Sequence, residues 1–275
     1  MQDSTPNKTK SDKAAPRVAL YVTCLVNTLR PQIGFACVQL IERLGFRVEV
    51  PATQTCCGQP GYNGGLRQQA MAIARQQIAL LEPFDHVVVP SGSCAGMMIN
   101  HYPELLKQDL SWLQRSQALA GKTLELAQFL DQHHWQPDSP PPQHHRRTWA
   151  HHTSCSCRRE TRSHQCAESM LQLAGYELAE LQDQAVCCGF GGSFAAKFDA
   201  LSSRMGRNKL NQVADCKATG VVSADLGCLL HLESLAGMTG LSGLAEKGTQ
   251  DFLHVAELLA ACQEPQQSSS DVPTS

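Results

Sequence analysis

The sequence lacks an excess of charge of either sign. Its 275 residues carry 23 Lys and Arg against 25 Asp and Glu, a net charge of −2 with His neutral. A protein that binds nucleic acid or an anionic membrane surface normally gathers basic residues on one face, and this composition supplies no such footprint. We therefore expect neither nucleic acid nor a lipid surface among its partners.

Long apolar runs are also missing. No stretch reaches the ~20 apolar residues that a membrane-spanning helix needs, so we expect no membrane insertion. Residues 1–16 are polar and have no apolar core, and they resemble neither a signal peptide nor an anchor. The expectation is a cytoplasmic protein whose N-terminal segment, 1–16, is disordered.

Cysteine, in contrast, is abundant, with 13 residues. In a chain without an export signal the cellular thiol pool keeps cysteines reduced, so a disulfide framework is not expected. Eight of the cysteines follow a pattern that occurs twice: Cys24, Cys56-Cys57-Gly58 and Cys94 return as Cys155, Cys187-Cys188-Gly189 and Cys228. The early cysteine and the Cys-Cys-Gly both recur after 131 positions (155 − 24 and 187 − 56).

Four thiols per half is the number of ligands that tetrahedral zinc or an iron–sulfur cluster requires. Structural zinc sites usually contain cysteines only a few residues apart, whereas the first-half cysteines are dispersed over 70 positions (94 − 24). This dispersal favours an iron–sulfur cluster held by a whole domain and leaves zinc as the alternative. Gly58 and Gly189 permit the turn that lets two adjacent cysteines face one site. A thiol–disulfide oxidoreductase is the least favoured interpretation, because vicinal disulfides are strained.

The five remaining cysteines have no counterpart in the repeat. Cys37, on the apolar face of a predicted helix, is expected to be a small buried hydrophobe, and we expect the same of Cys166 and Cys262. Cys157 and Cys216 are also assigned structural roles. Cys157 stands two residues from Cys155 and is therefore a candidate spare ligand.

Strand and helix patterns alternate between the cysteines. Strands are predicted at 17–23, 46–50, 86–90, 176–180 and 220–223, and helices at 31–44 and 66–81. This order predicts an α/β fold of two pseudo-symmetric halves, each a small parallel sheet flanked by helices. The halves are predicted at 17–132 and 149–262, with a Pro- and His-rich linker at 133–148 and a disordered tail at 263–275. Because ligands bind beyond the carboxyl ends of parallel strands, the cysteines of each half should converge on one edge.

With these residues identified, the chain resembles the CCG (cysteine-rich) superfamily, which includes a cysteine-rich component of heterodisulfide reductase and the iron–sulfur component of glycolate oxidase. The likeness runs from about Arg17 to Leu259 and is closest to the lactate-utilisation protein A family. It rests on four segments: VTCLV at 22–26, QTCCGQP at 54–60, PSGSC at 90–94 and CCGFGGSF at 187–194.

The resemblance implies an iron–sulfur electron-transfer subunit of a non-flavin L-lactate dehydrogenase complex, which oxidises lactate to pyruvate. Its partners would be a ferredoxin-like iron–sulfur subunit and a third small subunit, and L-lactate is a candidate ligand. Carried over by position, clusters of the 4Fe-4S type would be held by two sets of residues: Cys24, Cys56, Cys57 and Cys94 in the first half, and Cys155, Cys187, Cys188 and Cys228 in the second.

The chain departs from the superfamily pattern at three positions. Each half of the fullest pattern ends in Cys-x-x-Cys, but here Ser91 and Asp225 replace the first of those cysteines, which argues against an unusual non-cubane cluster. Ser156 stands where the family usually places His after Cys155. His152 and Arg159 flank that cysteine and are weak candidates for binding a substrate carboxylate or an anionic cluster, with a surface salt bridge as the alternative role.

Overall fold

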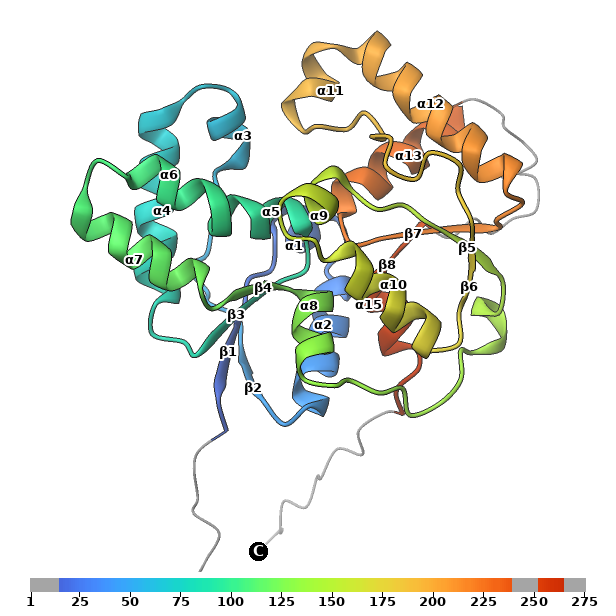
Figure 1. Ribbon diagram of the computed structural model, residues 1–275, viewed down its shortest axis with the longest axis horizontal. Coiled ribbons are helices and arrows are strands. Elements are labelled where there is room, and N and C mark those ends of the chain that lie inside the picture. The colour runs from blue at the N-terminus through green and yellow to red at the C-terminus, as the bar shows by residue number, and fades with distance from the viewer. Residues whose placement is uncertain (1–14, 239–251, 265–275) are drawn as a thin grey trace, which may run out of the picture.

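Two parallel β-sheets with the same strand order organise the chain (Figure 1). A computed structural model describes residues 15–238 and 252–264. The first sheet has the order β2-β1-β3-β4 and the second the order β6-β5-β7-β8. The strands are β1 (Arg17–Leu20), β2 (Arg47–Glu49), β3 (His86–Val89), β4 (Thr123–Glu125), β5 (Thr148–His151), β6 (Glu177–Ala179), β7 (Gly220–Ser223) and β8 (Phe252–His254). The predicted α/β architecture of two repeated halves is therefore confirmed.

Helices connect the strands and cover both faces of each sheet (Figure 1). The first half contains α1 (Cys24–Leu29), α2 (Gln32–Arg43), α3 (Gln59–Asn63), α4 (Arg67–Leu81), α5 (Gly92–Gly96), η1 (Met97–His101), α6 (Tyr102–Leu106), α7 (Leu110–Ala120) and α8 (Leu126–Gln132). The second half contains η2 (Gln143–His145), α9 (Cys155–Arg159), α10 (His164–Leu173), α11 (Ser193–Lys197), α12 (Asp199–Asp215), α13 (Leu226–Met238) and α15 (Val255–Ala260). The helices predicted at 31–44 and 66–81 correspond to α2 and α4.

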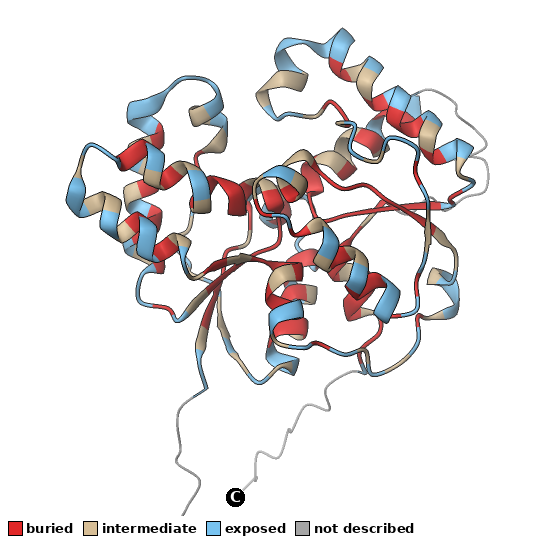
Figure 2. Cartoon of the chain, viewed as in Figure 1, coloured by how far each residue is buried: buried red, intermediate tan, exposed pale blue. Residues whose placement is uncertain are grey.

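Alternate residues of β1 face two different cores. Val18 and Leu20 belong to a core that continues into the second half, whereas Ala19, and Tyr21 directly after the strand, belong to a core within the first half. This division follows from the alternation of side chains along a strand. In the shared core, α2 packs against α15 and α8 packs against α10, and Figure 2 shows buried residues along these central helices. The two halves are thus joined by a common apolar interior.

Part of the segment predicted as a linker, 133–148, is packed against the rest of the protein. Trp135 is 1% exposed and belongs to the shared core. The backbone N–H of Asp138 donates to the carbonyl of Cys262 at 2.9 Å, and the Asp138 carboxylate pairs with Arg43 at 2.8 Å. The segments expected to be disordered, 1–16 and 263–275, lie almost entirely outside the described residues.

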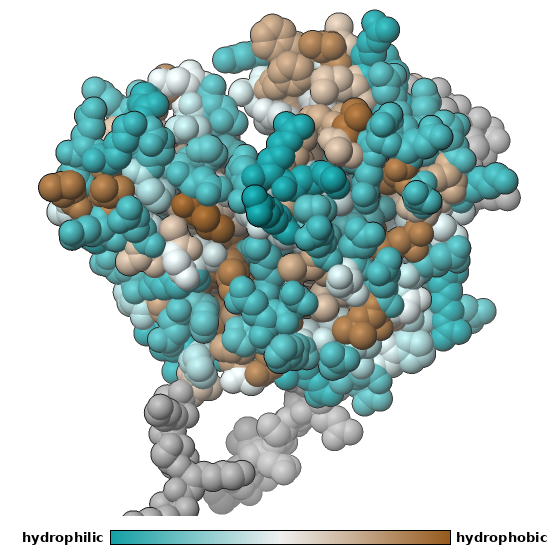
Figure 3. Space-filling model, viewed as in Figure 1, coloured by the Kyte–Doolittle hydropathy of each residue, from teal (hydrophilic) through white to brown (hydrophobic). Residues whose placement is uncertain are grey.

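The surface carries no extended apolar face on the side drawn in Figure 3, where apolar side chains form small, separate patches on a largely hydrophilic surface. Within residues 15–238 and 252–264, no helix combines the length and the apolar character needed to cross a membrane.

Candidate functional site

The early cysteine of each half begins a short helix directly after a strand. Cys24 is the first residue of α1, and Cys155 is the first residue of α9. The hydroxyls of Thr23 and Ser154, one position earlier, accept hydrogen bonds from the first-turn backbone. Such N-caps satisfy free N–H groups where the chain leaves the strand and enters the helix. Both thiols are thereby held at the carboxyl ends of the central strands.

The double cysteine of each half lies in a turn that requires glycine. Gly58 has φ 85° and Gly189 has φ 91°, in the left-handed region. A Cβ at Gly189 would also lie 2.6 Å from the carbonyl oxygen of Ser202. In this conformation the N–H of Gly58 donates to the sulfur of Cys56 at 3.5 Å, and the N–H of Gly189 donates to that of Cys187 at 3.3 Å. The turn therefore directs a backbone donor at one sulfur of each pair.

In the first half, four sulfurs form a continuous series of contacts. Cys56 accepts hydrogen bonds from the thiols of Cys24 and Cys57, which lower the pKa of Cys56 far below its ordinary value. The Sγ atoms of Cys57 and Cys94 are 3.4 Å apart. The hydrogen bond to Cys56, together with burial, raises the pKa of Cys24. The four thiols thus form one interacting group.

The second half repeats the same series in the same order. Cys187 accepts hydrogen bonds from Cys155 and Cys188, which lower the pKa of Cys187 far below its ordinary value. A hydrogen bond from Cys188 and the proximity of His152 lower the pKa of Cys228 to about 7, against the opposing effect of burial. The ring of His152 and the sulfurs of Cys188 and Cys228 lie within 4.8 Å of one another. We call the two groups the first and second quartets.

The donor atoms of both quartets fit an iron–sulfur cluster. The four thiols of each quartet are linked by successive pairwise contacts, and the backbone N–H groups directed at Cys56 and Cys187 match the hydrogen bonds that tune such clusters. The same sulfur donors are also compatible with zinc. Cys57 and Cys188 are buried, whereas Cys24 is exposed and Cys155 is half-buried. Each quartet is therefore covered on one side and reachable from solvent on the other.

His152 and Arg159, the two weak candidates beside Cys155, are placed very differently. His152 is 2% exposed, and neither of its ring nitrogens has a hydrogen-bond partner of good geometry within the described ranges. Arg159 is exposed, and the ion pairs formed within residues 15–238 and 252–264 do not include it. The salt bridge considered for Arg159 is thus not formed in this part of the chain.

The cysteines outside the repeat occupy varied environments. Cys37 and Cys262 are 0% exposed, in agreement with their predicted packing role. The prediction that Cys166 is buried was wrong: it is half-buried, and its thiol donates to a carboxylate oxygen of Asp131 at 3.5 Å. Cys216 is also half-buried. The thiol of Cys157, the candidate spare ligand, is 2% exposed and donates to a carboxylate oxygen of Asp225 at 3.6 Å.

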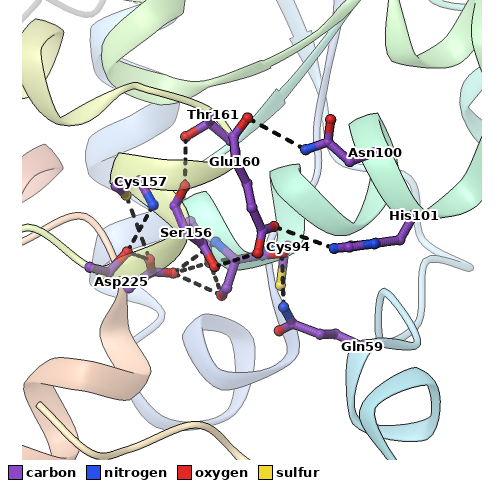
Figure 4. Close-up of polar contacts among 12 residues, drawn as sticks. Gln59, Cys94, Asn100, His101, Ser156, Cys157, Glu160, Thr161 and Asp225 are labelled. Atoms are coloured by element: carbon purple, nitrogen blue, oxygen red, sulfur yellow. Dashed lines mark hydrogen bonds and ion pairs between the residues drawn. The ribbon is translucent and has the colours of Figure 1, made fainter. Parts of the chain in front are cut away.

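Asp225 connects the two halves through hydrogen bonds (Figure 4). One of its carboxylate oxygens accepts from the hydroxyls of Ser91 at 2.5 Å and Ser93 at 2.9 Å, and the other accepts from the hydroxyl of Ser154. Asp225 is 4% exposed. Ser91 and Asp225 hold equivalent positions, each three residues before the last cysteine of its quartet, Cys94 or Cys228. The sequence marked both as departures from Cys-x-x-Cys but gave no sign that they would meet.

Two glycines allow the cysteine-bearing helices α5 and α9 to pack closely. A Cβ at Gly92 would lie 2.3 Å from the sulfur of Cys157, and a Cβ at Gly96 would lie 1.9 Å from a carboxylate oxygen of Glu160. The spacing of four residues places both glycines on one face of α5. Figure 4 shows Glu160 extending from α9 toward His101, with which it pairs at 3.7 Å. This crossing brings Cys94 and Cys155 onto touching helices.

Comparison with known proteins agrees with this duplicated arrangement. The family model described as "Cysteine-rich domain" matches residues 18–99 and 149–233. The chain belongs to the cysteine-rich domain family. It is 36% identical over 244 residues to lactate utilization protein A of Bacillus pumilus, covering 88% of this chain and 98% of the relative. It is 37% identical over 246 residues to lactate utilization protein A of Geobacillus kaustophilus, covering 89% and 99%.

A solved structure shares the fold at low sequence identity. A hypothetical protein from Helicobacter pylori superposes with a TM-score of 0.63 at 11% identity, over 95% of this chain and 51% of that chain. This chain therefore spans about half the length of that protein.

Proposed function

We propose that this chain is an iron–sulfur electron-transfer subunit of a non-flavin system that oxidises L-lactate to pyruvate. The observation that carries the proposal is the pair of matched four-thiol sites, each assembled from three separate segments at the carboxyl edge of a parallel sheet. The relatives that share 36–37% identity are called lactate utilization protein A, which supports a role in lactate use. The system would be cytoplasmic and would include a ferredoxin-like iron–sulfur subunit and a third small subunit.

In this proposal the first and second quartets each hold one cluster, of the 4Fe-4S type. A bound cluster supplies one-electron redox capacity whose potential depends on hydrogen bonding, burial and charge. The chain provides the N–H donors of Gly58 and Gly189 and the buried thiols of Cys57 and Cys188. The contact between α5 and α9 holds the two quartets at a fixed separation.

Anaerobic purification with analysis of iron and acid-labile sulfide tests this function. We expect several of each per chain, with Cys56→Ser and Cys187→Ser each removing one component of the visible and EPR spectra. Cys216→Ser is the matched control, because this half-buried thiol lies outside both quartets. In the complex reconstituted with its partner subunits, lactate should reduce the wild-type clusters. Full cofactor content and full activity in both quartet variants would contradict the proposal.

A zinc-stabilised assembly subunit without redox activity is the second candidate. It is favoured by the position of His152 among Cys188 and Cys228, since mixed sulfur and imidazole donors are typical of structural zinc. This candidate predicts a colourless protein that contains zinc and lacks sulfide. The same metal and sulfide analysis therefore separates the two functions.

A further inference from the structure

The helices packed beneath the two quartets can be aligned residue by residue. The turn at Gly58 lies against Ala70 of α4, and the turn at Gly189 lies against Ser202 of α12. Since the two glycines are equivalent, Ala70 corresponds to Ser202, an offset of 132 positions (202 − 70). The same offset can be applied to the rest of both helices.

At this offset Gln77 of α4 corresponds to Lys209 of α12, and both side chains are 0% exposed. The Gln77 amide donates to the hydroxyl of Thr55 at 2.9 Å, so this neutral group is satisfied next to the first Cys-Cys-Gly turn. The Lys209 ammonium donates to the backbone carbonyl of Asp183 at 3.1 Å. No ion pair formed within the described residues includes Lys209.

A fully buried lysine is rare unless an anion compensates its charge. Burial lowers the pKa of Lys209, and the nearby cysteines of the second quartet and Asp183 oppose that lowering. Asp183 is exposed, so solvent and salt weaken its effect. Gly206, one turn before Lys209 on α12, lies against the second Cys-Cys-Gly turn, where an added Cβ would be 3.2 Å from the carbonyl oxygen of Cys188. An anionic cluster held by the second quartet would therefore lie beside the part of α12 that carries this ammonium, and its negative charge would compensate the charge of Lys209. The first quartet has the neutral Gln77 at the equivalent position.

We propose that Lys209 raises the reduction potential of a cluster held by the second quartet above that of a cluster held by the first. Reduction adds a negative charge to the cluster, and a buried cation stabilises that charge strongly because the low dielectric of the interior screens it little. Asp225 opposes this effect, but it bonds to side chains of both halves and so acts on both quartets. An electron shared between the sites then settles on the second half. This inference rests on the proposed function and adds to it the half on which the electron comes to reside.

Redox titration followed by EPR tests the proposal in the full chain. Lys209→Gln introduces the residue type that the first half has at the equivalent position, Gln77. Lys209→Met removes the charge while keeping a similar side-chain volume. We expect both variants to retain iron and sulfide and to show at least a tenfold decrease in the equilibrium constant for reducing the second-quartet component, a shift of about 59 mV to lower potential. The component that disappears in Cys56→Ser should keep its potential. Lys209→Arg, which retains the charge, should resemble the wild type.

Lys217→Gln is the matched control, because it removes the same charge from an exposed position just beyond α12 and should shift neither potential. If Lys209→Gln and Lys209→Met kept full iron content and unshifted potentials, this inference would be overturned while the proposed function would stand. An equal shift in the potentials of both cluster components would overturn it in the same way. Absence of iron and sulfide from the wild-type protein would refute the proposed function and this inference with it.

Discussion

Replacing Gly92 with alanine tests how closely α5 and α9 must approach. The added Cβ would lie 2.3 Å from the sulfur of Cys157, 2.9 Å from its backbone nitrogen and 3.1 Å from its Cα. Carbon contacts are optimal at about 3.5–4.0 Å, and backbone atoms cannot rotate away, so the helices must separate. We expect Gly92→Ala to lower the free energy of unfolding by about 1–3 kcal/mol, the usual cost of adding a methyl group to a packed core. Urea denaturation followed by circular dichroism measures this loss.

Two other glycines calibrate the result. Gly96→Ala meets the carboxylate end of Glu160 at 1.9 Å, and because this flexible side chain can move, the loss should be smaller than for Gly92→Ala. Gly34→Ala in α2 meets only Val22 at 3.7 Å, an ordinary contact, and should stabilise the helix by up to about 1 kcal/mol. Cys157→Ala should partly rescue Gly92→Ala, since it removes the nearest clash. Equal stability of Gly92→Ala and Gly34→Ala would refute the close crossing.

Two further predictions concern buried carboxylates. Burial raises the pKa of Glu125 to about 8 from its ordinary 4.5, so its stabilising contribution is complete below pH 4.5 and decreases as the pH rises toward 8. Between these pH values the free energy of unfolding should fall with pH, and Glu125→Gln should remove up to about 1.4 kcal/mol per pH unit of that slope. Urea denaturation at several pH values measures the slope. Asp225→Ala leaves the hydroxyls of Ser91 and Ser154 without their shared acceptor, and it should lower the free energy of unfolding by at least about 1–3 kcal/mol. Asp225→Asn should lower it by less. Equal losses in the two variants would show that the carboxylate charge is irrelevant.

Local patterns in the sequence were sufficient to predict most of the fold. The strands predicted at 17–23 and 86–90 became β1 and β3, because runs rich in β-branched residues form buried parallel strands. The edge strands β4 and β8 were not predicted, because they are short and are defined by pairing with β3 and β7. The central strand β5 was also missed, because it begins at the end of the segment predicted as a linker. The duplication was the strongest signal, because it identified which cysteines belong together before any contact was known.

The contacts between the halves could not be predicted in the same way. Trp135 lies in a segment whose proline and histidine content suggested a linker, yet its side chain is buried in the shared core. The bonds of Asp225 to Ser91 and Ser154 join residues separated by 134 and 71 positions, and no local pattern encodes them. Lys209 lies in a segment for which no helix was predicted, and its burial depends on how α12 packs against the second half.

The differences between the halves matter for the proposed electron relay. Two identical sites have equal potentials, so an electron exchanged between them would reside equally on both. The capping hydroxyls and the turn glycines, which build each quartet, are present in both halves. Lys209 lies beneath the second quartet where the first half has the neutral Gln77, and Asp225, where the first half has Ser91, bonds to both halves. Arg159, beside Cys155, is also a charge that the first half lacks, since Thr28 holds the equivalent position. In the proposed relay, the duplicated residues bind the clusters, and the buried charge of Lys209 determines on which half the electron resides.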